Sequence, residues 1–234
     1  EFGYSYNGTA KVDYTINERN SISAHWFAGQ GNQVAPVGSR LLYYYEVAPI
    51  HVQNYALVFN HTFSPSLTNQ LLAGVNYFNQ IFDDNKTGFN VPATGLITGS
   101  AFTSAPNINI GTFDATGKTP PEGRNDITGH LTEDLSWTVG RHQFKFGGEF
   151  RQAQLDEFYH RHATGSFTFD GTKGGWNIPA SYGLDPATDT LQITFLTSLA
   201  DFLTGNYANA SIALGDPERQ VFVNTYDIFL QDSW

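Results

Sequence analysis

The sequence predicts an all-β chain, namely an antiparallel, up-and-down transmembrane β-barrel segment of about seven strands with long extracellular loops. Three observations lead to this prediction. Extended runs alternate apolar and polar residues, short and long connections follow one another in turn, and large aromatic residues gather near the ends of the runs. With 19 Phe, 12 Tyr and 4 Trp among 234 residues, the chain also has the composition of an aromatic-rich β protein.

The first two runs, at about 9–16 and 21–29, are separated by the Asn-rich stretch 17–20 and form a predicted hairpin. Because side chains of a strand point alternately to its two faces, one face of this hairpin is apolar and the other polar. The apolar face carries Val12, Tyr14 and Trp26, and the polar face carries Lys11, Asp13 and His25.

A second predicted hairpin joins runs at about 51–63 and 70–82 through the short connection 64–69. The face of its second strand is ambiguous, because Leu71 and Leu72 are both apolar.

The third predicted hairpin joins runs at about 125–137 and 143–155 through "TVGRH", and a seventh run covers about 220–234. Glu133 interrupts the apolar face, which we interpret as a β-bulge or a change of register. Leu131, Phe144, Phe146 and Phe150 fall on the apolar face, and His130, Lys145, Glu149 and Arg151 on the polar face.

The connections alternate in length, which places all the long ones at the same end of the sheet. The long loops are predicted at about 30–50, 83–124 and 156–219 of a single barrel domain that covers 1–234, and the last contains a short helix within 195–205. Loops beyond about 12–15 residues are uncommon in compact domains unless they are functional. Short turns at one end and long loops at the other are typical of outer-membrane barrels.

The alternative fold is a soluble β-sandwich whose apolar face packs on a second sheet. The predicted strands, at about 9–15 residues, are longer than the usual globular strand of about 5–6 and long enough to cross a bilayer obliquely. We therefore expect the apolar face to meet lipid and the polar face to meet a wet lumen. No apolar run of the sequence is long enough for a membrane-spanning helix. A transmembrane barrel alternates lipid-facing and lumen-facing residues, so the mean hydropathy of -0.31 is typical of one.

Composition and motifs exclude several classes of function. A net charge of -10 with only 12 Lys and Arg argues against nucleic acid as a partner. The sequence contains no nucleophile elbow and no phosphate loop. Glu133 and Glu149 are the best candidates for a catalytic carboxylate pair, but Glu133 falls on the face expected to meet lipid. We therefore expect that the protein is not an enzyme. No cofactor is expected; calcium bound by the acidic stretches 82–86 or 185–189 is the alternative left open.

Several segments resemble strands and hairpins of TonB-dependent outer-membrane receptors, in particular the Oar-like subgroup with a carboxypeptidase-regulatory-like N-terminal domain. They are "KVDYTINERNSISAHW", "TFSPSLTNQLLAGVNY", "HQFKFGGEFRQ" and "NTYDIFLQDSW". The resemblance implies a barrel of about 22 strands around a plug, in the outer membrane of a Gram-negative bacterium. It also implies import of an extracellular solute, driven by the energy-coupling TonB protein through a part absent from this sequence.

An odd number of strands leads us to expect an excerpt of a larger barrel, because an unclosed sheet would leave backbone groups unpaired in lipid. Aromatic residues in the predicted mouth loops, Tyr43, Tyr44, Tyr45 and Trp176, are candidates for stacking on the solute. The alternative function is a secreted glycan-binding adhesin or lectin-like module that uses the same aromatic loops. Partition of the native protein into detergent or water would separate the two.

Overall fold

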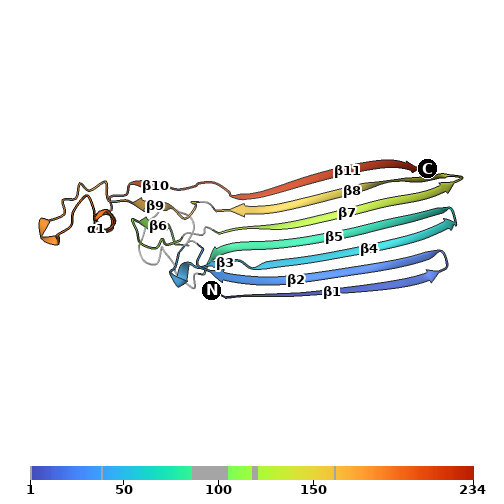
Figure 1. The fold of residues 1–234 in the computed structure, drawn as a ribbon, viewed down its shortest axis with the longest axis horizontal. Coiled ribbons are helices and arrows are strands. Elements are labelled where there is room, and N and C mark those ends of the chain that lie inside the picture. The colour runs from blue at the N-terminus through green and yellow to red at the C-terminus, as the bar shows by residue number, and fades with distance from the viewer. Residues whose placement is uncertain (1, 38, 86–104, 118–120, 161) are drawn as a thin grey trace.

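Seven long strands lie side by side in one antiparallel sheet in the computed structural model, which describes residues 2–37, 39–85, 105–117, 121–160 and 162–234 (Figure 1). Consecutive long strands are neighbours throughout, as in an up-and-down wall. The long strands are β1 (Phe2–Asn17), β2 (Asn20–Ala35), β4 (Ile50–Ser64), β5 (Leu67–Asp84), β7 (Glu122–Val139), β8 (His142–Tyr159) and β11 (Glu218–Ser233). The short β3 (Glu46–Val47) bridges the ends of β2 and β5.

The long strands have 15 to 18 residues, which is longer than the alternation pattern predicts, and the turns are correspondingly shorter. Backbone pairing continues past the apolar part of each strand, because ladder hydrogen bonds do not depend on the side chains. The hairpins turn at residues 18–19, 65–66 and 140–141. Gly140 has a φ of 62°, a left-handed conformation that tight hairpin turns favour and that glycine adopts without strain.

The long connections all leave the end of the sheet opposite these turns (Figure 1). Two of them fold together. β6 (Asn107–Ile110) pairs in parallel with β9 (Ser166–Phe169), and β9 pairs with β10 (Asn209–Ser211). The helix α1 (Thr190–Thr204) packs against β6 and β9, which confirms the predicted helix and extends it toward the N-terminus. We call β6, β9, β10, α1 and the residues that connect β9 to α1 the loop unit.

Two further short helical turns lie in the long connections: η1 (Leu42–Tyr44) after β2 and η3 (Ala180–Tyr182) before α1. The helix α1 ends at Gly205, whose backbone N–H bonds the Asp201 and Phe202 carbonyl oxygens at a φ of 76°. Of the helices in the described residues, none is long and apolar enough to cross a membrane.

The long sheet has a single layer, and no second sheet or helix covers its apolar side chains among the described residues. Phe146 is 37% exposed and Phe150 is 39% exposed, although β8 has a neighbouring strand on each side. The few buried apolar residues lie at the loop end of the molecule. The sandwich alternative required these rings to lie beneath another layer, so the fold is an all-β antiparallel wall without a protein core of its own.

Candidate functional site

The strand register divides the long sheet into two chemically different faces. Cross-strand partners point to the same side of a sheet, so each row of partners can be assigned to one face. One such row links Val12, Ala24, Leu57, Ala73, Leu131, Phe150 and Tyr226. The residues predicted to face lipid all lie on this side of the sheet: Val12, Tyr14, Trp26, Leu131, Phe144, Phe146 and Phe150. We call it the apolar face.

Glu133 lies on the apolar face without any bulge, so the predicted bulge or register change is wrong. It is opposite Leu71 on one side and Gly148 on the other, in ladders that run without interruption. The Asn69 side-chain amide donates a hydrogen bond to its carboxylate, which gives this polar group a partner on the apolar face. The same register resolves the ambiguity in β5, because it places Leu71 on the apolar face.

The two carboxylates considered as a catalytic pair are not brought together. Glu149 is the cross-strand partner of Thr132, the neighbour of Glu133, and therefore points to the opposite face of the sheet. A retaining or inverting glycosidase needs both carboxylates on the same side of one substrate. The sequence left this open, because a bulge at Glu133 would have moved its side chain to the other face.

The polar face carries two adjacent rows of opposite charge. One row links Lys11, His25, Ala56, Gly74, His130, Arg151 and Thr225. The next row toward the turns links Asp13, Ser23, Val58, Leu72, Thr132, Glu149 and Asp227. We call these the basic row and the acidic row. The residues predicted to line a lumen thus all lie on this face, with Lys145 four residues from Glu149 toward the turns.

Ion pairs connect the two rows along individual strands. Lys11 Nζ lies 2.9 Å from Asp13 Oδ2, and Arg151 Nη2 lies 2.6 Å from Glu149 Oε1. The Ser23 hydroxyl donates a further hydrogen bond of 2.5 Å to Asp13. Asp227 faces Glu149 across the β8–β11 pair, and the sequence alone did not predict this position because it depends on the pairing of β11 with β8. The two rows therefore contain two ion pairs and one further carboxylate, Asp227, beside Glu149.

His130 lies over Gly74 in the basic row. A Cβ atom added to Gly74 would overlap the His130 ring, so the glycine provides the space in which the imidazole lies against β5. In this row only the small Ala56 separates His25 from the position that the His130 ring covers.

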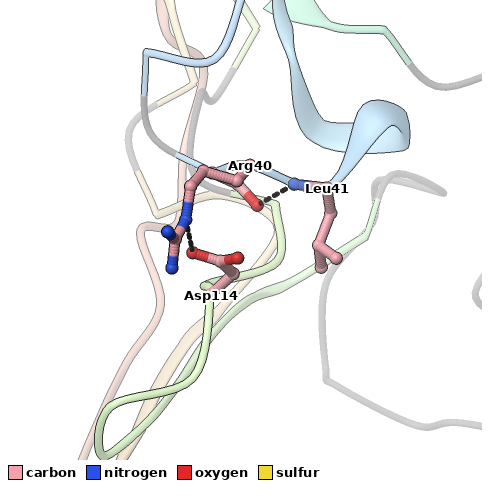
Figure 2. A network of polar contacts seen from close by, with 4 residues as sticks. Arg40, Leu41 and Asp114 are labelled. Carbon is pink, nitrogen blue, oxygen red and sulfur yellow. Dashed lines mark hydrogen bonds and ion pairs between the residues drawn. The ribbon is translucent and has the colours of Figure 1, made fainter.

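The predicted mouth tyrosines lie at the loop end, beside β3. Tyr43 is 61% exposed, whereas Tyr44 is half-buried, and burial together with the Asp84 carboxylate raises the pKa of the Tyr44 phenol. The neighbouring loop is tied to the connection before β7 by Arg40, whose Nε donates to Asp114 Oδ1 at 3.2 Å (Figure 2). Tyr43 therefore has the free surface that stacking on a solute requires, and stacking by Tyr43, Tyr44 and Tyr45 stays a prediction.

Trp176 has a structural partner within the loop unit. Its indole N–H donates a hydrogen bond of 2.7 Å to Asp201 Oδ1, and a Cβ added to Gly174 would overlap its ring. Asp201 is fully buried and also accepts hydrogen bonds from the backbone N–H groups of Lys173 and Gly174. Sequence reasoning missed Asp201, although a lone acidic residue in an uncharged helix is a signal for such a partner.

Glycines at the same place let two loops approach α1. Gly111 and Gly171 have φ values of 47° and 85°, and a Cβ at either would overlap Ser198 or Thr197 of the helix. Ser198 is fully buried, and its hydroxyl donates a hydrogen bond of 2.6 Å to the Thr194 carbonyl oxygen. The loop unit is thus closely packed around a few polar residues.

The acidic stretches considered for calcium are engaged in local hydrogen bonds. Asp185 Oδ1 accepts from the Ala187 backbone N–H, and Asp189 Oδ2 accepts from the Asp185 backbone N–H. The stretch 82–86 ends at Lys86, outside the described residues. In the described part of the chain, no group of three or more His, Asp or Glu side chains has the arrangement of a metal site.

A comparison with protein families decides the class of this two-faced wall. The family model of the outer membrane beta barrel domain matches residues 1–234. The chain belongs to this family. Neither a curated protein nor a solved structure gave a significant match. The protein is therefore an outer-membrane β-barrel protein of a bacterium.

The apolar face of this outer-membrane β-barrel protein carries a band of apolar side chains across the long strands. Toward the loops, the first polar residues of the band in β2, β5 and β7 are Gln30, Asn79 and Asn125, which lie in one row. In β8 and β11 they are Gln152 and Asn224, which lie in the row of Trp26. The band therefore reaches less far toward the loops in β8 and β11 than in β2, β5 and β7.

Proposed function

We propose that this chain forms part of the wall of a TonB-dependent receptor, which binds a solute at its extracellular mouth and passes it through a gated lumen. The proposal rests on the two faces of the wall. The apolar band faces lipid, and the basic and acidic rows face the lumen. In this arrangement Phe144, Phe146 and Phe150 contact acyl chains, while Lys145, Glu149 and Arg151 contact water or a plug.

The paired charge rows carry the argument for passage of a polar solute. Lys11 and Arg151 of the basic row each form an ion pair with a carboxylate one row away, Lys11 with Asp13 and Arg151 with Glu149. Exposed ion pairs contribute little stability, about 0–1 kcal/mol each, so they can exchange partners at small cost. A polar or zwitterionic solute can therefore replace one charge by its own group without leaving the other charge unpaired.

The loop unit supports the mouth assignment. It folds two of the long connections into one compact body at the loop end. The connection after β2 joins this body through the hydrogen bond from Arg40 to Asp114, which lies between β6 and β7. We propose that this body and the exposed Tyr43 make the first contact with the solute. Binding and passage require no bond-breaking step, so the function proposed is transport without enzymatic activity, and nucleic acid is not a proposed partner.

The coupling to TonB can be tested with the full-length protein in its native membrane. Chemical crosslinking in intact cells should link the protein to the energy-coupling TonB protein, and removal of TonB should abolish solute uptake that depends on the protein. Uptake that continues unchanged without TonB would contradict the receptor and favour a passive pore. The secreted adhesin alternative is disfavoured by the outer-membrane family, and a native protein found free in the medium would restore it.

A further inference from the structure

We propose that the apolar face binds one outer-leaflet glycolipid, with an acyl chain in a depression of the wall and its sugar on a rim of amide side chains. The inference goes beyond solute transport, but it rests on the proposed orientation of the apolar face toward lipid. Its evidence is a depression, a rim and the charges near that rim.

The depression lies where small residues interrupt the large side chains of the apolar band. Its floor consists of Ala10, Ala24, Ala73 and Gly129, and its volume is about 670 Å³. A Cβ added to Gly129 would meet no atom within 4 Å, so the space above this glycine is open. The walls are formed by Trp26, Tyr55, Leu57, Val75, Leu131 and Phe150.

The position of the depression indicates that its occupant is a hydrocarbon chain. Its walls are aromatic and aliphatic, and it lies inside the apolar band of a protein of the outer membrane. An empty apolar hollow in a bilayer would forfeit dispersion contacts on one side of every wall atom. An acyl chain of a neighbouring lipid restores these contacts, and the rigid register of the strands keeps the hollow from collapsing.

The rim toward the loops offers primary amides to a head group. Gln152 lines the depression, and its side-chain N–H donates a hydrogen bond of 3.0 Å to Asn224. Gln53 accepts a hydrogen bond of 2.8 Å from the Tyr55 hydroxyl in the next row. A primary amide has two N–H donors and a carbonyl with two lone pairs, so both glutamines keep donors and acceptors for a further partner.

The charges near the rim select the kind of head group. On the apolar face, the described strand residues between this rim and the loop end of the sheet include no Lys or Arg. They do include Asp156, which accepts hydrogen bonds from Gln154 and Gln220. Phosphate recognition uses Arg and Lys, whereas amides and carboxylates bind hydroxyl groups well. The rim therefore favours the sugar hydroxyls of a glycolipid over an anionic phospholipid, and the loop end of a barrel faces the outer leaflet.

The first experiment compares two open glycines of the apolar face in the full-length protein. Gly129→Leu fills the depression, and Gly8→Leu, whose Cβ would also meet nothing within 4 Å, fills instead a smaller neighbouring hollow beyond Trp26. The lipid that copurifies after detergent extraction is identified and counted by mass spectrometry. We expect about one glycolipid per unsubstituted molecule, a loss of about tenfold for Gly129→Leu, and no change for Gly8→Leu.

Three results would overturn the proposal. They are an unsubstituted protein that loses all lipid, equal retention by the two variants, and a change of oligomeric state in Gly129→Leu, which would make the face a contact between copies. If Gly129→Leu fails to insert into the membrane, the number of glycolipids bound to the unsubstituted protein still tests the proposal. Failure of TonB crosslinking would leave all these measurements unaffected, so the two proposals fail separately.

The second experiment tests the head group in nanodiscs of phosphatidylcholine that contain the full-length protein. A neutral glycolipid, monoglucosyl diacylglycerol, or the anionic phosphatidylglycerol is added, and the bound lipid is counted. We expect the glycolipid to bind and Gln152→Leu to weaken its binding about fivefold, as expected for one lost hydrogen bond. Preferential binding of phosphatidylglycerol would overturn the sugar assignment.

Discussion

The long sheet and the loop unit bury their residues in opposite ways. In the sheet, apolar rings such as Phe150 remain 39% exposed and polar groups occupy the other face, so the protein supplies no interior. In the loop unit, Phe169 is 7% exposed, and Asp201 and Ser198 are fully buried with hydrogen-bond partners. The comparison teaches that the loop unit satisfies the ordinary rules of a water-soluble fold, whereas the sheet satisfies them only when a bilayer takes the place of a core.

The largest expected effect comes from placing a charge on the apolar face. Phe150→Arg should lower the stability of the fold in lipid vesicles by about 2–4 kcal/mol, because a cation near the bilayer midplane must leave water. The control Lys145→Gln, on the other face of the same strand, should change it by less than about 0.5 kcal/mol. Urea titration of the full-length protein in vesicles measures both, and equal effects would refute the assignment of the faces.

The corresponding change in the loop unit should act locally. Asp201→Ala removes the acceptor of three hydrogen bonds and leaves the Trp176 indole and two backbone N–H groups without their partner. Hydrogen bonds to charged groups contribute about 1.5–3 kcal/mol, so we expect a loss of at least about 2 kcal/mol in the local stability of the loop unit.

Hydrogen exchange measures this loss separately in the two regions. Exchange should accelerate at residues 173–176 and in α1 but remain unchanged in β7 and β8. The control Asp185→Ala alters a surface turn of the same connection and should leave α1 protected. Faster exchange throughout the long sheet would show that the two regions do not fold independently.

An intermediate effect is expected for the acidic residue of the apolar face. Glu133→Leu should increase stability in vesicles by about 1 kcal/mol, because a carboxylate facing lipid is unfavourable even with a partner. Asn69→Leu should decrease stability instead, since it leaves the Glu133 carboxylate without the donor that bonds it. Vesicle unfolding of the two single variants checks the opposite signs, and a loss of stability in Glu133→Leu would argue for a watery surrounding.

The smallest effect concerns an exposed turn of the loop unit. The side-chain and backbone donors of Thr172 lower the pKa of Asp170 below its ordinary value of 3.8. A carboxyl group with a lowered folded-state pKa stabilises the fold above its unfolded pKa, and this contribution is lost as pH falls through the folded pKa. Thr172→Ala should therefore reduce the stability of the loop unit slightly at pH 7 and not at pH 2. Hydrogen exchange at both pH values tests this, and a difference that persists at pH 2 would contradict it.

The site was predictable from the sequence where alternation was clear. Phe144, Phe146 and Phe150 could be separated from Lys145, Glu149 and Arg151 because the side-chain period of a strand is two. Glu133 could not be placed, since a bulge and a polar residue on an apolar face give the same sequence pattern. Asp227 and Asp201 were missed because their roles depend on partners that are distant in the sequence.

The sequence by itself determined the all-β class, the seven long strands, their two faces and the end at which the long loops lie. Alternation and turn residues are local properties, and they act within a few positions of the chain. Only the tertiary structure decided the rows of opposite charge, the partners of the buried Asp201 and the union of two loops through the pairing of β6 with β9. Those features depend on which residues of different strands are opposite each other, and that register is set by backbone pairing over the whole sheet.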